Sequence, residues 1–353
     1  MVDWTSSMSQ TFEFYEVDPG TWKNKRILRN IKSCTINWDL DSVTLGSASI
    51  SCEEDLGELY IRVYLVTIQN GVTEKHPLGT FIAQTPSTEF DGKAKSITMD
   101  AYSPLIELKE KKPPIGYSIS IGSNVMANAV KLTETNLRAP VVNTTGTKAL
   151  LSNFVSDTED TWLSFITDLI SNDKRRYDLD EMGRVMFAPE QDAASLQPVW
   201  TYTDDNSSIL YPEISFDKDL YGVPNVVEIV YSSDTRYVYS KIVNKDPNSP
   251  ISTVNRGREI IYRETNPSIC DNPTQTQLDD YAKRLLRGLS SLECKVSYTH
   301  GYCPVRIGDG VMLDYKSAGL SFQKAKVITQ SIKCESGCPV TETAVFSTNL
   351  WGD

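Results

Sequence analysis

The chain of 353 residues has little that points to catalysis. It contains two histidines, His76 and His300, and neither stands beside a nucleophile in a recognisable motif. Nucleophilic catalysis of the Ser/His/Asp or Cys/His type needs a histidine next to the nucleophile. The sequence also lacks the phosphate-binding pattern GxxxxGK[ST] and the zinc-protease pattern HExxH. We therefore predict that the protein is not an enzyme and that it has no cofactor and no catalytic residue.

Long apolar runs and a basic N-terminus are also missing. The first residues, MVDWTSSMSQ, do not form a secretion signal, and no window approaches the roughly 18 apolar residues that a membrane helix requires. The seven cysteines are odd in number and widely spaced, which is typical of free thiols in a reducing cytoplasm. We expect a protein that is made and assembled in the cytoplasm, without a membrane anchor.

Basic residues are outnumbered, with 35 Lys and Arg against 46 Asp and Glu, giving a formal net charge of −11. A protein that binds nucleic acid tightly through charge needs clustered Lys and Arg to replace counterions. The composition therefore argues against such a protein. It remains compatible with a surface along which DNA slides without being held.

Two possible metal sites are considered and set aside. Four cysteines in the last third could supply thiolates to zinc, namely Cys294, Cys303, Cys334 and Cys338. However, Cys294 and Cys303 have eight residues between them, whereas zinc knuckles usually have two tight pairs. Asp178, Asp180 and Glu181 resemble a calcium loop, but the acidic ligand at position 12 is absent. We predict no metal, and a hairpin with its turn at Asp180–Gly183.

Residues 21–102 have the alternation that is typical of β-strands. In LYIRVYLVT the apolar residues Leu59, Ile61, Val63 and Leu65 alternate with Tyr60, Arg62 and Tyr64. This pattern predicts strands with one buried face. Asn70-Gly71 and Asp91-Gly92 tolerate the backbone angles of tight hairpins. Short strands at close spacing favour a barrel or a sandwich.

The composition changes at KEKKPPIG, residues 109–116, which we interpret as a domain boundary. A short helix is expected after Ser123. A second helix is predicted at 157–171, with Ser156 and Glu159 at the spacing of a capping box. The hairpin at Asp180–Gly183 follows it. Residues 113–199 therefore form a predicted α+β insert.

From residue 200 the chain returns to β structure. NVVEIVYS and RYVYSKIV look like a pair of strands. An amphipathic helix is predicted at 276–289, with Leu285 and Leu286 on its apolar face. Four strands are expected after it, at 293–299, 310–315, 325–333 and 341–347. The predicted fold is mainly β with an α+β insert, and the predicted domains are 1–112, 113–199 and 200–353.

Three places in the chain carry a family likeness. They are PNVVEIVYSS at 224–233 with Asn225, DPNSPISTVNRGREIIY at 246–262, and the helix from Leu278 to Leu289 followed by PVRIGDGVMLDY at 304–315; MDAYSPLIELK at 99–109 also fits the family order. In the last segment Gly308 and Gly310 permit a tight turn, and Asp309 can accept backbone N–H bonds there. In this order the segments resemble the tail-hub proteins of bacteriophages, the family related to the baseplate hub of contractile-tailed phages.

The resemblance spans nearly the whole chain, and it implies an architecture and a role. Two tube-like β-barrels would flank the insert, and a homotrimer would present a sixfold-like ring. That ring would join the hexameric tail tube, or a distal tail protein, to a threefold spike or tail fibre. It would line the channel for genome ejection, which the tape measure protein fills before DNA passes through. The location implied is the tail tip or baseplate of the virion.

Other readings remain open. In the same setting, the chain could be a distal tail protein or the hub of a phage-derived injection machine. In a different class, it could be a cell-wall-degrading enzyme, since any two carboxylates can meet in space. It could also be a carbohydrate-binding adhesin that stacks sugars on Trp4, Trp22, Trp38 and Tyr15, although Trp38 alternates with core residues and is expected to be buried.

Overall fold

The computed structural model describes residues 2–90, 92, 95–205, 208–269 and 272–351. Strands dominate it, so the predicted mainly β fold is confirmed. The strands are β1 Ser9–Val17, β2 Asn24–Leu28, β3 Ile31–Asp39, β4 Gly46–Cys52, β5 Leu59–Gln69, β6 Val72–Phe90, β7 Lys95–Tyr102, β8 Ser118–Ile119, β9 Phe154–Val155, β10 Arg175–Leu179, β11 Val185–Pro189, β12 Pro198–Thr203, β13 Leu210–Lys218, β14 Val226–Ser232, β15 Tyr237–Val243, β16 Ile261–Thr265, β17 Ser291–Gly301, β18 Gly310–Asp314, β19 Gln323–Lys333 and β20 Pro339–Asn349. The helices are α1 Ile106–Glu110, α2 Val125–Asn136, α3 Trp162–Ser171, α4 Thr253–Arg256 and α5 Gln275–Leu289, with 3-10 turns at Ala193–Ser195 and Lys316–Ala318.

The chain forms two compact units, and each is built from separate stretches of sequence. Unit 1 contains Met1–Ile214 and Tyr298–Thr343, and unit 2 contains Ser215–Ser297 and Ala344–Asp353. Strands β13, β17 and β20 carry the chain from one unit into the other. These bounds do not coincide with 1–112, 113–199 and 200–353, so the three-domain division stays a prediction.

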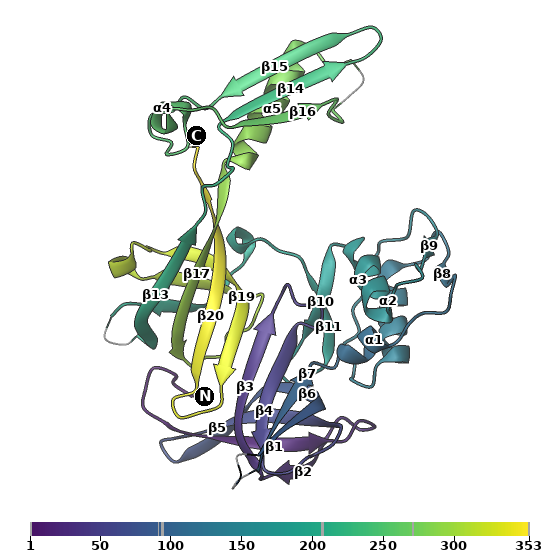
Figure 1. The fold of residues 1–353 in the computed structure, drawn as a ribbon, viewed down its shortest axis with the longest axis vertical. Coiled ribbons are helices and arrows are strands. Elements are labelled where there is room, and N and C mark those ends of the chain that lie inside the picture. The colour runs from purple at the N-terminus through teal and green to yellow at the C-terminus, as the bar shows by residue number, and fades with distance from the viewer. Residues whose placement is uncertain (1, 91, 93–94, 206–207, 270–271, 352–353) are drawn as a thin grey trace. The chain divides into compact units, whose positions relative to one another are not determined.

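The main sheet joins the two ends of the sequence. Its strand order is β13-β17-β20-β19-β3-β4-β7-β6-β5-β1-β2, and β12 and β18 pair beside this path. In unit 1, β19 pairs antiparallel with β3, which brings Ile332 opposite Ile36. The β regions before and after the insert therefore share one sheet (Figure 1).

The hairpin prediction at Asn70-Gly71 is confirmed. Asn70 and Gly71 have φ angles of 51° and 78° between β5 and β6. Asp91, in the second predicted turn, lies outside the described residues, whereas β6 and β7 pair from Ile82 opposite Tyr102 to Phe90 opposite Lys95.

The prediction of one buried face is wrong for β5. Its second face is buried as well, with Tyr60, Arg62 and Tyr64 at 2%, 1% and 9% exposure. Alternation on a single strand cannot reveal this, because the cover comes from a distant part of the chain. The β10–β11 hairpin covers Arg62 and Tyr64 through Met182. Trp22 and Glu107 pack against Tyr60.

Helices α2 and α3 of the insert pack together with α1, which precedes the insert, beside that hairpin (Figure 1). The predicted capping box of Ser156 and Glu159 is wrong. Helix α3 begins later, where Thr161 accepts from Ser164 N at 3.1 Å and Ser164 Oγ accepts from Thr161 N at 2.9 Å. The preceding residues form a turn in which Asp160 Oδ2 accepts from Asp157 N at 2.7 Å, so the helix cannot start there.

Unit 2 is a three-stranded sheet, ordered β15-β14-β16, with α5 against one face (Figure 1). The predicted pairing of the segments around residues 226–243 is confirmed in β14 and β15. The helix predicted at 276–289 is also confirmed, as α5. Leu286 is fully buried in the core under the sheet, and Leu285 is partly buried against it. No helix in the described parts of the chain is long and apolar enough to cross a membrane.

Candidate functional site

In unit 1, the turn of the β10–β11 hairpin is docked through several polar contacts. The β10–β11 hairpin is predicted correctly, and its turn is held by Asp180, whose Oδ1 accepts from Met182 N at 3.0 Å and Arg184 N at 2.8 Å. Gly183 has a φ of +74°, and a Cβ there would lie 2.7 Å from Thr80 Cβ. The turn therefore needs glycine for both its backbone angle and its close approach to β6.

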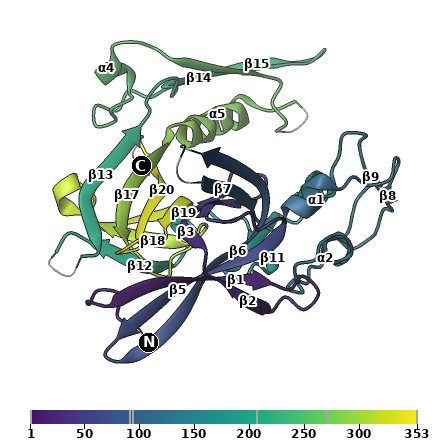
Figure 2. The ribbon, with the colours of Figure 1, turned by 60° about the horizontal axis from the view of Figure 1, so that its bottom comes forward.

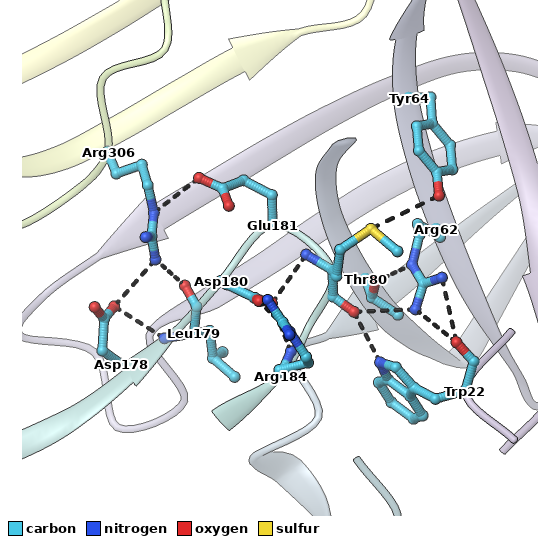
Figure 3. Close-up of polar contacts among 11 residues, drawn as sticks. Trp22, Arg62, Tyr64, Thr80, Asp178, Leu179, Asp180, Glu181, Arg184 and Arg306 are labelled. Atoms are coloured by element: carbon cyan, nitrogen blue, oxygen red, sulfur yellow. Dashed lines mark hydrogen bonds and ion pairs between the residues drawn. The ribbon is translucent and has the colours of Figure 1, made fainter. Parts of the chain in front are cut away.

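On one side, the turn meets Arg306 (Figure 3). The guanidinium donates to Leu179 O, forms an ion pair with Glu181 at 3.0 Å, and lies 3.6 Å from Asp178 Oδ1. The carboxylates that resemble a calcium loop in the sequence are thus arranged around an arginine. They act here as partners of a cation that the chain itself supplies.

On the other side, the turn meets Arg62, which is 1% exposed (Figure 3). Its Nη2 donates to Met182 O at 3.0 Å, and its Nε donates to Thr80 Oγ1 at 2.9 Å. Trp22 Nε1 donates to the same Met182 oxygen at 2.8 Å. Burial lowers the pKa of Arg62. A buried guanidinium that depends on carbonyl and hydroxyl oxygens requires the turn to stay docked.

The glycine-rich segment singled out in the sequence lies at this junction. Gly308 has a φ of +88°, and a Cβ on Gly310 would lie 2.7 Å from Leu196 Cβ. Asp309 Oδ2 accepts from Arg306 N at 2.9 Å, and burial raises the pKa of this carboxyl group. The segment therefore shapes the backbone that presents Arg306.

Sequence reasoning did not find the junction. The hairpin turn and the segment at 308–310 were both singled out, but Arg62, Met182 and Arg306 were not. The signal available for Arg62 is its position, a charged residue within the alternating pattern of β5. We interpreted it as solvent-facing, because charged residues usually are.

A second polar cluster lies inside the sheet of unit 1. His300 and Glu342 are both fully buried, with Nε2 and Oε1 3.4 Å apart. The carboxylate also accepts from Gln330 at 2.8 Å, Tyr298 at 2.9 Å and Tyr202 at 3.2 Å.

The two charges of this cluster support each other. Burial by itself would lower the pKa of His300, but Glu342 and Cys303 together outweigh that effect and raise it to about 10. Burial would raise the pKa of Glu342, and His300 together with the hydrogen bonds lowers it. Neither side chain reaches solvent, and the pair links β17, which carries His300, to β20, which carries Glu342.

The remaining residues singled out in the sequence lie in unit 2. Asn225 is fully buried, and its side chain donates to Ile251 O at 2.9 Å and Arg258 O at 3.0 Å and accepts from Ile260 N at 2.8 Å. Its side chain therefore links the segment between β15 and β16 to the start of β14. Leu285 and Leu286 belong to the α5 core described above.

The described cysteines are free thiols, and they contact different neighbours. Cys303 lies 3.4 Å from Tyr202 OH, and Cys294 lies 3.8 Å from Thr348 Oγ1. A hydrogen bond with Cys34 and burial raise the pKa of Cys334. Within the described residues, no group of three or more His, Cys, Asp or Glu side chains is arranged to hold a metal ion.

The four rings considered for sugar stacking do not form an exposed platform. Trp38 is buried at 8% exposure, as predicted, and Trp22 is buried at 9%. Trp4 packs edge-on against His76 and Tyr302, with ring centroids 4.8 and 5.1 Å apart.

No family model matches the sequence, and no curated protein matches it. Several solved structures share the fold. A tail protein from Neisseria meningitidis MC58 has a TM-score of 0.62 at 12% identity, covering 97% of this chain and 98% of that one. The 43 kDa tail protein of prophage MuSo2 from Shewanella oneidensis has a TM-score of 0.59 at 10% identity, covering 95% and 98%.

A third match is the PdpA-VgrG complex from Francisella, with a TM-score of 0.58 at 10% identity. It covers 98% of this chain and 59% of that chain. The resemblance to phage tail and baseplate hub proteins is thus confirmed at the level of the fold: the chain is built, over nearly its whole length, like phage tail proteins.

Proposed function

We propose that the chain is a structural hub protein of a phage tail tip or baseplate. The observation that carries this proposal is the match of nearly the full length, in both directions, to two tail proteins, one of them from a prophage. A match over both whole chains is what a shared structural role would produce. A domain borrowed for another purpose would match only part of each chain.

The polar clusters support a structural role rather than an enzymatic one. The buried ion pair of His300 and Glu342 is closed to solvent, and Arg62 is committed to the docked turn. A catalytic acid or base must reach a substrate. We therefore propose that these groups hold strands and turns in place.

In the proposed assembly, three copies form a ring at the tail tip inside the virion, after synthesis in the host cytoplasm. Two tube-like β-barrels and the insert of each copy give the ring sixfold-like character. The ring joins the tail tube, or a distal tail protein, to a spike or tail fibre. The tape measure protein occupies the channel until DNA follows. Closed symmetry of this kind covers exposed strand edges.

The direct test is cryo-electron microscopy of tails that carry this protein with a small tag. The proposal predicts density for three copies around the tail axis. Six copies, or a single copy, at the tip would contradict the threefold ring.

The proposed channel gives a second test. Its wall should be neutral or acidic, because Lys and Arg would bind phosphates and slow ejection. The net charge of −11 supports this expectation. A ring structure with a continuous Lys- and Arg-lined lumen would refute the proposal that DNA slides along the channel wall without being held. It would not affect the hub assignment.

The likeness to the PdpA-VgrG complex favours one alternative, the hub of a phage-derived injection machine. A phage tail tip and a phage-derived injection machine differ in the cargo they deliver rather than in the fold of the hub. Particles purified by sedimentation and treated with nuclease separate them: protected DNA in particles that carry the chain indicates a phage, and particles without DNA indicate an injection machine.

A further inference from the structure

The sheet that passes through unit 1 has an open edge at each end of its strand order. Among the described strands, β2 pairs only with β1, and β13 pairs only with β17 (Figure 2). An open edge presents unpaired N–H and C=O groups that can take up another strand. The two edges differ in length, exposure and charge.

Strand β13 is long for an edge strand, with nine residues, and seven of the nine are exposed. Exposed aromatic side chains include Tyr211 at 44% and Phe216 at 45%. Alternation places Glu213 and Asp217 on one face of the strand and Lys218, the basic residue of β13, on the other. A strand exposed on both faces buries little apolar area by itself, so pairing with another strand would stabilise it.

Strand β2 is short and basic. Lys25 and Arg26 both pair with Glu16 of the neighbouring strand, and their side chains remain 59% and 64% exposed. Lys23 and Arg29 flank the strand and are exposed. A short edge rich in Lys and Arg resists nonspecific strand addition. The same charges would favour one particular acidic partner.

The charges of each edge disfavour its pairing with the same edge of a second copy. Two β13 edges would bring acidic residues together, and two β2 edges would bring basic residues together, whereas β13 against β2 places opposite charges across the new pair. We propose that the occupant of each edge is a second copy of this chain, with β13 of one subunit adding to β2 of the next. This inference rests on the proposed ring and names the strands that close it.

Head-to-tail pairing of unlike edges is heterologous, so it generates a ring when the rotation between subunits closes. Symmetric pairing of like edges would instead give a twofold dimer. The charge difference between β2 and β13 therefore specifies a ring over a dimer. Pro212 cannot donate a backbone hydrogen bond, so the new pair runs from Glu213 onward.

The test is a charge-reversal series in the full chain, followed by sedimentation velocity over a range of protein concentrations. Glu213→Lys with Asp217→Lys reverses β13, and Lys23→Glu with Arg29→Glu reverses β2. The matched control is Lys131→Glu with Lys148→Glu, which reverses two exposed charges in the insert. Circular dichroism checks that every variant is folded.

Each edge variant should raise the concentration at which the wild-type ring half-assembles by at least tenfold, and the control should leave it unchanged. Combining both reversals in one chain should restore part of the assembly, because the introduced glutamates and lysines then attract each other across the pair while Lys25 and Arg26 remain. If the wild type forms trimers that neither edge variant weakens, the strand assignment is overturned and the hub proposal stands. If the wild type stays monomeric at all concentrations and in tails, both are overturned.

Discussion

The two compact units bury polar groups of different kinds. In unit 1, the buried polar side chains include the charged residues Arg62, Glu107, His300 and Glu342. In the described part of unit 2, they are all asparagines and serines: Asn225, Ser240, Asn244, Ser249, Ser252 and Ser290.

The difference shows how each unit specifies its fold. A buried charge is tolerable only with its partner in place, because losing the partner leaves the charge without compensation. Neutral amides and hydroxyls have a smaller cost when unpaired, and their bonds do not change with pH near neutrality. Unit 1 should therefore be sensitive to pH and to loss of single partners. Unit 2 should depend mainly on its apolar core under α5.

The largest expected effect is the introduction of a charge into unit 2. Leu286→Asp should lower the free energy of unfolding by about 5 kcal/mol and prevent soluble folding, because it buries a carboxylate without a partner. Leu285→Asp should cost less, since Leu285 is only partly buried. The control is Lys283→Asp on the exposed face of the same helix. Soluble yield and urea unfolding measure the effect, and normal yield of both leucine variants would contradict the assigned face.

The next effect is the loss of a charge from unit 1. His300→Leu leaves Glu342 buried without its cation and should cost about 4 kcal/mol. The double variant His300→Leu with Glu342→Met removes both charges and should be more stable than His300→Leu alone. Denaturant unfolding of the wild type, His300→Leu, Glu342→Met and the double variant tests this expectation. A double variant as unstable as the sum of the two single variants would show that the pair is not coupled.

A smaller effect is expected for Asn225→Ala in unit 2. The substitution leaves two carbonyls, of which that of Ile251 is buried, and one N–H without their partner, and it should cost about 3 kcal/mol. Asn255→Ala is the comparison, because its two hydrogen bonds lie on an exposed residue. The loss for Asn225→Ala should be the same at pH 6 and pH 8. A strong dependence on pH would argue that an ionisable group lies behind it.

The last effect is the pH dependence of wild-type stability, which is the smallest only when it is taken per pH unit. The pKa of His300 is about 10 in the folded chain and 6.5 as the ordinary value, so its contribution is complete below pH 6.5 and is lost as the pH rises through 10. Over this range stability should fall by up to about 1.4 kcal/mol per pH unit. The quantity to measure is the difference between wild type and His300→Gln. A difference that grows with rising pH would contradict the ion pair.

Local patterns in the sequence predict much of this fold. Asn70-Gly71, the Asp180–Gly183 turn and the apolar stripe of α5 each depend on neighbours within a few residues, and each is found in the structure. The capping box at Ser156 failed for a local reason, since competing side-chain bonds make a turn there.

Long-range contacts could not be predicted in the same way. The pairing of β3 with β19 joins residues nearly 300 positions apart, and no periodicity encodes it. The alternation of β5 predicts that Arg62 faces solvent. The group that covers it, Met182 O, comes from a hairpin 120 residues later. The candidate site is made of such contacts. Its turns are predicted from the sequence, but the contacts between the β10–β11 turn, Arg62 and Arg306 are not.

The most direct test of the account is the mass of the purified full chain by native mass spectrometry, at concentrations where rings can assemble. The account predicts a species of three times the 39.5 kDa chain. A twofold dimer as the assembled species would contradict the threefold hub and the pairing of unlike edges.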